Sequence, residues 1–230
     1  MKFKKHLSLL FILIIVAVLS ACSNTSASEK IYNHLEKAVE LEEEFEKQQD
    51  KIVKLEKKEQ NIYSKIIDLS MDDFDKIKKL SDKALKSIEK RAEKIEMEKE
   101  SIHASKEEFI KIKDLIDQLE NKQAKDTAEK MFSVMMERYN AYDKLYQAYS
   151  KSLERETKLY KMLQKKDLKQ ETLSNHIKKL NNSYEKVIDA NKTFNSRTAE
   201  YNELKEKFYK QADIKVEYED NASSKDKNNK

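Results

Sequence analysis

Apolar residues recur every three to four positions along most of the chain, which is the spacing of one face of an α-helix. The pattern predicts four long helices, at about residues 29–69, 71–119, 124–164 and 168–211. Turns as short as those between them make consecutive helices antiparallel neighbours. We therefore expect an all-α fold, an elongated antiparallel bundle of four long helices with coiled-coil-like packing. Two separate helical hairpins are the alternative, but they would leave the broad apolar face of the third helix in water.

Polar residues interrupt some of the apolar rows and leave others intact. The fourth helix has one row without interruption, at a spacing of seven residues: Leu173, Leu180, Val187, Phe194, Tyr201 and Phe208. In the second helix, the middle of one row is Arg91, Glu98 and Ser105, which predicts that this helix is partly solvated there. In the third helix, three polar residues interrupt two of its three apolar rows: Arg138, Ser152 and Glu156.

Two of the predicted helices begin with a capping pattern. A hydroxyl or carboxylate residue followed three positions later by an acidic or amide residue is typical of a helix N-terminus. Ser70 is followed in this way by Asp73, and Asp167 is followed by Gln170. The patterns predict that Ser70 caps the second helix and Asp167 the fourth.

The composition narrows the possible functions. The chain contains no glycine and no proline, whereas phosphate-binding loops, dinucleotide fingerprints and nucleophile elbows all need glycine for a tight turn or a close backbone approach. No catalytic constellation is found, so we expect a protein that is not an enzyme and needs no cofactor. Without residues 1–21 the chain has 44 basic and 43 acidic side chains, a balance that argues against nucleic acid as a partner.

The N-terminus resembles an export signal followed by a lipid-attachment site. A lysine-rich segment precedes an apolar run at residues 7–19, which is too short to span a bilayer comfortably but has the length of a signal-peptide core. The run ends in Leu19-Ser20-Ala21-Cys22, which resembles the lipobox of bacterial lipoproteins and implies cleavage before Cys22 and a diacylglyceryl group on its sulfur. Cys22 is the only cysteine of the chain. An ordinary secreted protein with one incidental cysteine is the alternative.

These features predict four regions along the chain. Residues 1–21 are a signal peptide, residues 22–28 a lipidated N-terminus with a short tether, and residues 29–211 the helical bundle domain. Residues 212–230 are a disordered polar tail, because acids, lysines and asparagines replace the apolar period there. Two acyl chains on one residue give stable attachment, so we expect the protein on the extracytoplasmic face of the cell membrane.

Three stretches of the predicted helices resemble a known family. The stretches are Ile31-Tyr32 with Leu35-Glu36 and Glu44–Gln49, then Met71–Leu80, then Met135–Tyr139 with Ala141–Asp143. They are similar to the YkyA-type cell-wall binding lipoproteins, and the similarity runs from the lipobox to about Ala212. The resemblance implies a surface lipoprotein of a Gram-positive bacterium, associated with peptidoglycan or wall polymers. It brings no catalytic residues.

Histidine and carboxylate side chains are one candidate for metal binding. Glu100 and His103 form a Glu-x-x-His pair, but a di-iron bundle needs two such pairs and the mature chain has only one. His34 and His176 fall at different predicted heights along the bundle, so the three histidines cannot share a metal. We expect no metal site and solvated or half-buried histidines.

Four tyrosines of the third helix are the second candidate. Tyr139, Tyr142, Tyr146 and Tyr149 are spaced three, four and three residues apart, so they share one helix face. Such a face could stack against glycan strands. Packing in the core, with each hydroxyl reaching the surface, is the favoured interpretation, because the same rows continue as methionine, leucine and phenylalanine.

The sequence favours one function and leaves two others open. The favoured function is a lipid-tethered helical rod that binds wall material or organises envelope proteins as a scaffold. A wall-active enzyme or its regulator is the alternative. A solute-binding lipoprotein is disfavoured, because such proteins are two-lobed α/β folds and a chain without glycine or proline fits them poorly.

Overall fold

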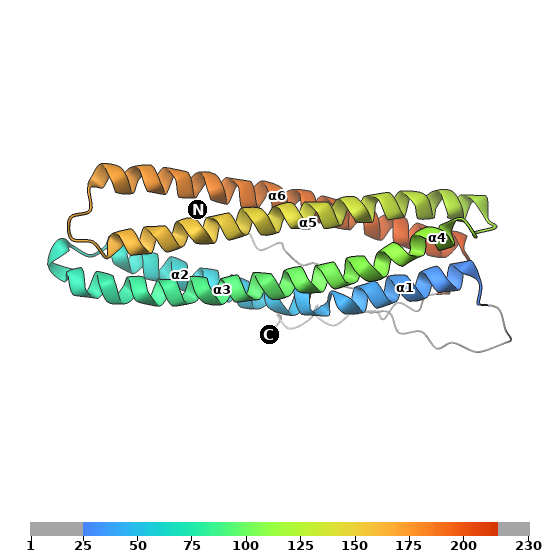
Figure 1. Cartoon of the computed structure of the whole chain (residues 1–230), viewed down its shortest axis with the longest axis horizontal. Coiled ribbons are helices and arrows are strands. Elements are labelled where there is room, and N and C mark those ends of the chain that lie inside the picture. The colour runs from blue at the N-terminus through green and yellow to red at the C-terminus, as the bar shows by residue number, and fades with distance from the viewer. Residues whose placement is uncertain (1–24, 216–230) are drawn as a thin grey trace, which may run out of the picture.

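The computed structural model describes residues 25–215, and every regular element in that range is helical (Figure 1). The elements are α1 (Ala27–Leu41), α2 (Glu43–Ile67), η1 (Met71–Asp73), α3 (Phe74–Phe109), η2 (Ile110–Ile112), α4 (Lys113–Ile116), α5 (Lys122–Leu163) and α6 (Gln170–Gln211). Helix α1 continues into α2, and α3 continues through η2 into α4. Together with α5 and α6 they make four long rods, each antiparallel to its neighbours in the chain. The predicted elongated bundle is confirmed.

The start of α1 and the end of α6 lie at the same end of the bundle (Figure 1). Ser26 and Glu29 form a capping box at the start of α1, each side chain accepting a hydrogen bond from the other residue's backbone. The ring of Tyr32 meets that of Tyr209 edge-on at 5.4 Å, and the Tyr209 hydroxyl donates to Glu36 at 2.7 Å. The α2–α3 and α5–α6 turns lie together at the opposite end.

Two apolar clusters fill the interior, one toward each end of the rods. The cluster near the start of α1 and the end of α6 contains residues of all four rods, among them Leu35, Phe109, Met131 and Phe208. The cluster near the α2–α3 turn is built from α2, α3 and α5. The broad apolar face of α5 contributes to both clusters, and α5 packs on α3 and on α6. Two separate hairpins are therefore excluded.

The predictions drawn from the capping patterns are only partly confirmed. The Ser70 side chain accepts a hydrogen bond from the backbone of Asp72 at 3.3 Å, so Ser70 is a cap as predicted, but of the short helix η1. Asp73 binds Lys76 at 2.6 Å. The prediction for Asp167 is wrong: Lys169 is the N-cap of α6, and it makes no side-chain capping bond. Asp167 lies inside the α5–α6 turn, which runs two residues further than the pattern indicates.

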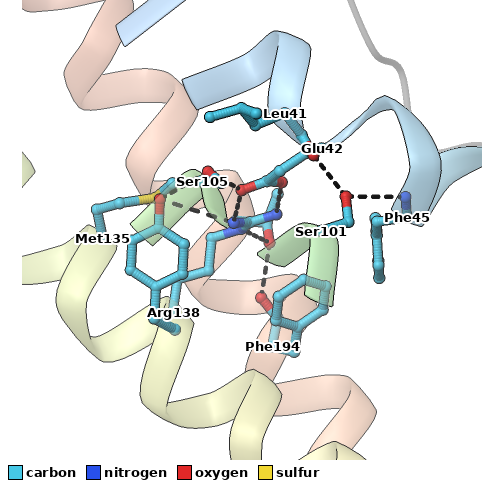
Figure 2. A network of polar contacts seen from close by, with 10 residues as sticks. Leu41, Glu42, Phe45, Ser101, Ser105, Met135, Arg138 and Phe194 are labelled. Atoms are coloured by element: carbon cyan, nitrogen blue, oxygen red, sulfur yellow. Dashed lines mark hydrogen bonds and ion pairs between the residues drawn. The ribbon is translucent and has the colours of Figure 1, made fainter. Parts of the chain in front are cut away.

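The first predicted helix is broken at Glu42, where the sequence has neither glycine nor proline. The Ser101 hydroxyl of α3 accepts a hydrogen bond from the Phe45 backbone at 3.1 Å and donates to the Leu41 carbonyl at 2.5 Å (Figure 2). A side chain inserted into the backbone ladder in this way is a known cause of helix bends. The break between α1 and α2 follows, and the Glu42 side chain points into the bundle.

None of the helices between residues 25 and 215 carries an apolar stretch sufficient to cross a lipid bilayer. The predicted signal peptide, Cys22 and the predicted tail from residue 216 onward lie outside the described residues.

Candidate functional site

The polar residues that interrupt the apolar rows meet inside the bundle. Beside the bend, Arg138 of α5 binds both carboxylate oxygens of Glu42, with Nη1–Oε1 and Nη2–Oε2 distances of 2.8 and 2.6 Å (Figure 2). Arg138 Nε donates to the Thr198 hydroxyl of α6 at 2.9 Å, and Ser105 of α3 donates to Glu42 at 2.8 Å. We call these four residues the Arg138 network. Through it, all four rods are joined at one level.

The Arg138 network is fully enclosed. The side chains of Arg138 and Glu42 are 2% and 4% exposed. The guanidinium lies over the Phe194 ring at 4.7 Å, and the Ser105 and Tyr139 hydroxyls are hydrogen-bonded at 2.9 Å. A buried charge is costly unless it is paired and hydrogen-bonded, and each of these conditions is met here. The network therefore serves packing and does not face a substrate.

A second group with buried charges lies toward the α2–α3 turn. Arg91 of α3 is placed between Glu59 of α2 and Glu156 of α5 and binds both, while its Nη1 donates to the Tyr149 hydroxyl at 3.3 Å. We call these four residues the Arg91 network. Burial, with the nearby Glu156 charge, raises the pKa of Glu59 to about 7, and burial also raises the pKa of Glu156. Because two carboxyl groups share one guanidinium, each makes the charged form of the other less favourable, and the pair takes up a proton more readily than two ordinary glutamates would.

Glu98 is a buried carboxyl group between the two networks. It is 5% exposed, and among the described residues it pairs with no cation; Gln49 donates to it at 2.6 Å. Burial raises its pKa to about 8, and the nearby charge of Glu56 adds to the effect. The folded protein therefore binds this proton more tightly than the unfolded chain does. The resulting stability is fully present below the unfolded pKa and is lost as the pH rises to about 8.

These positions correct the prediction that the second helix is solvated in its middle. Arg91, Glu98 and Ser105 are all buried. The physical reason is that other rods supply a carboxylate, an amide and hydroxyl groups at the same levels. A residue such as Glu156 could have been selected from the sequence as a charged interruption of an apolar row. Its partner could not, because periodicity does not tell which rods face each other.

The four candidate tyrosines are part of the core or its margin. Tyr139 and Tyr142 are 1% and 2% exposed, which confirms core packing for both, although the Tyr139 hydroxyl is bound inside the bundle and does not reach the surface. Tyr146 and Tyr149 are half-buried. Tyr146 donates to Glu96, and the Tyr149 hydroxyl donates to a glutamate of α2 at 2.6 Å. No exposed aromatic platform results on this face of α5.

The histidines do not come together. Each has its own partner on another rod: His34 with Glu108 at 2.6 Å, His103 with Asp143 at 2.9 Å, and His176 with the Arg155 carbonyl at 2.8 Å. His176 is buried, so the expectation of a solvated or half-buried ring is wrong for it. Across residues 25–215, no group of three or more His, Cys, Asp or Glu side chains could hold a metal ion.

The fold and its enclosed networks define a class: an elongated all-α bundle whose interior polar groups hold its own helices together. Within this class the chain belongs to the YkyA family, because the family model, described as "Putative cell-wall binding lipoprotein", matches residues 26–211. The "Uncharacterized lipoprotein YkyA" of Bacillus subtilis (strain 168) is 36% identical over 199 residues, which cover 86% of this chain and 89% of that protein.

A solved structure shares the fold. It is a crystal structure of a conserved protein of unknown function from Staphylococcus aureus, with a TM-score of 0.70 and 18% sequence identity. The match covers 81% of this chain and 97% of that chain. At this identity the likeness shows the fold alone.

Proposed function

We propose that this protein is a lipid-anchored rod on the outer face of the cell membrane that binds cell-wall material without modifying it. The observation that carries the proposal is the extent of the family match, residues 26–211. This range is the helical bundle itself, from the cap of α1 to the last residue of α6. The bundle is therefore the part to which the family's description as cell-wall binding applies.

The geometry of the chain suits a protein held at one end. Helix α1 begins five residues after Cys22, and five extended residues reach at most about 18 Å. A lipid on Cys22 would thus keep the end of the bundle where α1 begins close to the membrane. The 42 residues of α5 span about 63 Å at the helical rise, so the α2–α3 turn would stand well away from the bilayer. A rod of this kind can hold wall polymers or envelope proteins at a fixed distance.

Sedimentation with purified peptidoglycan sacculi tests the binding. The full-length protein in mild detergent should pellet with sacculi at physiological salt, and the sacculi should release no soluble fragments. A protein that stays in the supernatant would contradict wall binding. Release of soluble glycan or peptide fragments would contradict binding without catalysis and favour a wall-active enzyme.

Cell fractionation tests the anchor. In cells that process lipoproteins, the chain should be found in the membrane fraction, and Cys22→Ala should move it to the medium or leave an unprocessed precursor. Ser23→Ala is the matched control, since it alters the neighbouring residue and keeps the sulfur. Membrane retention of a processed Cys22→Ala protein would refute the lipid attachment.

A further inference from the structure

A groove with an excess of lysines lies between α2 and α3, toward the end of the bundle that carries the α2–α3 turn. It has a volume of about 400 Å³. Lys58 of α2 and three lysines of α3, Lys83, Lys86 and Lys90, line it, against two carboxylates, Glu89 and Glu93. All six of these side chains are exposed. We call the four lysines the groove lysines.

The groove is built by close packing of the two helices beneath it. Ser87 and Ala84 of α3 are buried, and the Ser87 hydroxyl donates to the Leu55 carbonyl of α2 at 3.3 Å. These small side chains let the helices approach each other, while the lysines project to either side. The floor of the groove is therefore fixed by the fold, whereas its charged rim is free to bind.

The groove lysines carry charge that the protein itself does not neutralise. Six surface lysines pair with a glutamate one helical turn away, among them Lys47 with Glu43 at 3.0 Å and Lys111 with Glu108 at 2.5 Å, whereas most lysines of residues 25–215 form no ion pair. The groove is distinguished by bringing four such unpaired lysines together. Among residues 25–215, none of the four groove lysines forms an ion pair, although Glu89 and Glu93 line the same groove. Four unpaired ammonium groups around one groove favour an external anion.

The charge of the whole segment has the same sign. Residues 51–94, which form this half of the α2–α3 hairpin, contain 13 basic and 9 acidic side chains. The rest of residues 22–230 contains 31 basic and 34 acidic side chains. The positive excess is thus concentrated toward the end of the bundle that lies away from the start of α1 and the end of α6.

The spacing of the lysines favours a chain of anions over a single one. Lys83, Lys86 and Lys90 are three and four residues apart, so they lie on one face of α3 and span about 10 Å. One phosphate can reach only one or two of these groups. A polymer with a charge in every repeat can contact several at once, and many weak exposed contacts then add up to measurable binding. Lysine is also a common phosphate ligand, acting as a compact point charge.

We infer that this groove binds a wall-linked polymer of repeating phosphodiesters, an inference that rests on the wall binding proposed above and names its ligand class. Retention on sacculi tests it, with untreated sacculi compared with sacculi from which hydrofluoric acid has removed the phosphodiester polymers. The full-length protein should bind the stripped sacculi at least tenfold more weakly. Binding to untreated sacculi should weaken with added salt, because salt screens exposed charges.

Variants then assign the binding to the groove. Replacing all four groove lysines by glutamine should weaken binding to untreated sacculi at least tenfold, and Lys86→Gln alone should weaken it about twofold. The matched control changes the net charge by the same amount. It replaces by glutamine four exposed lysines of α5 and α6: Lys130, Lys144, Lys161 and Lys178. It should remain within twofold of the wild type. Circular dichroism should show all variants folded, because every replaced side chain is exposed.

The possible outcomes separate this inference from the proposed function. Equal binding to untreated and stripped sacculi would leave wall binding intact and overturn the phosphodiester ligand. Equal weakening by the groove variant and the control variant would overturn the groove as the binding site. Absence of binding to either preparation would overturn wall binding and the inference together.

Discussion

Removing one partner of the buried Glu42–Arg138 pair should destabilise the bundle far more than removing a surface arginine. In Arg138→Met the carboxylate of Glu42 stays buried and keeps only the hydrogen bond from Ser105. Breaking a buried pair in this way typically costs about 3–5 kcal/mol. For a protein of this size, that loss lowers the melting temperature by roughly 6–20 °C. Arg197→Met is the control, because Arg197 is 38% exposed and its ion pairs are worth below about 1 kcal/mol.

The double variant Glu42→Leu with Arg138→Met separates the pair from its surroundings. It removes both charges at once. The two hydroxyl groups that contacted the pair keep other hydrogen bonds: Ser105 with the Tyr139 hydroxyl, and Thr198 with the Phe194 carbonyl. Replacing a buried ion pair by apolar side chains is often neutral or stabilising. We therefore expect the double variant to recover most of the stability lost in Arg138→Met.

Urea unfolding followed by circular dichroism at 222 nm measures these differences. The urea midpoints of the wild type, Arg138→Met, Arg197→Met and the double variant should be compared at pH 7. Where the slopes of the unfolding free energy against urea are equal, each shift in midpoint reports a change in the free energy of unfolding. The reasoning fails if Arg138→Met costs no more than Arg197→Met. It also fails if the double variant is as unstable as Arg138→Met, because the cost would then come from lost packing and not from an unpaired charge.

Three further predictions use the same unfolding assay. Ser101→Ala removes the hydroxyl that satisfies the backbone at the bend, so it should cost about 1–3 kcal/mol, and a cost near zero would mean that the bend has another cause. Glu98→Gln should stabilise the protein at pH 9, where the wild type holds an unpaired buried carboxylate. The gap between the ordinary pKa of 4.5 and about 8 corresponds to on the order of 5 kcal/mol. The wild type should lose stability from pH 5 to 8 more steeply than Glu98→Gln, and parallel curves would contradict the assignment. Ser26→Ala removes the cap of α1 and should cost about 0.5–2 kcal/mol; no change would show that the capping box adds nothing to stability.

The helices could be predicted from the sequence because their apolar rows are local and repetitive. The uninterrupted row of α6, from Leu173 to Phe208, needs no knowledge of its neighbours. The bend at Glu42 could not be predicted in this way. Its cause is the hydroxyl of Ser101, which lies 56 positions along the chain from the Phe45 backbone that it binds.

The polar interior was visible in the sequence only as a set of exceptions. Arg91 and Glu98 stand in an apolar row, and exposure to water is the simplest explanation for a charge at such a position. The structure gives a different reason: Glu59, Glu156 and Gln49 lie opposite them on other rods. Which charged residues meet depends on how the rods are paired, and a seven-residue period carries no such information.

The same exceptions explain how such a repetitive chain reaches one alignment of its rods. Sliding one rod by seven residues moves it about 10 Å and keeps apolar rows facing apolar rows, so the rows alone distinguish the alignments poorly. The same slide separates Arg138 from Glu42, or Arg91 from Glu59, and leaves charges buried without partners, at a cost of several kcal/mol each. The ion pairs thus favour one register. Because Lys58 lies on α2 and the other groove lysines on α3, the buried charges also determine which lysines line the groove on the surface.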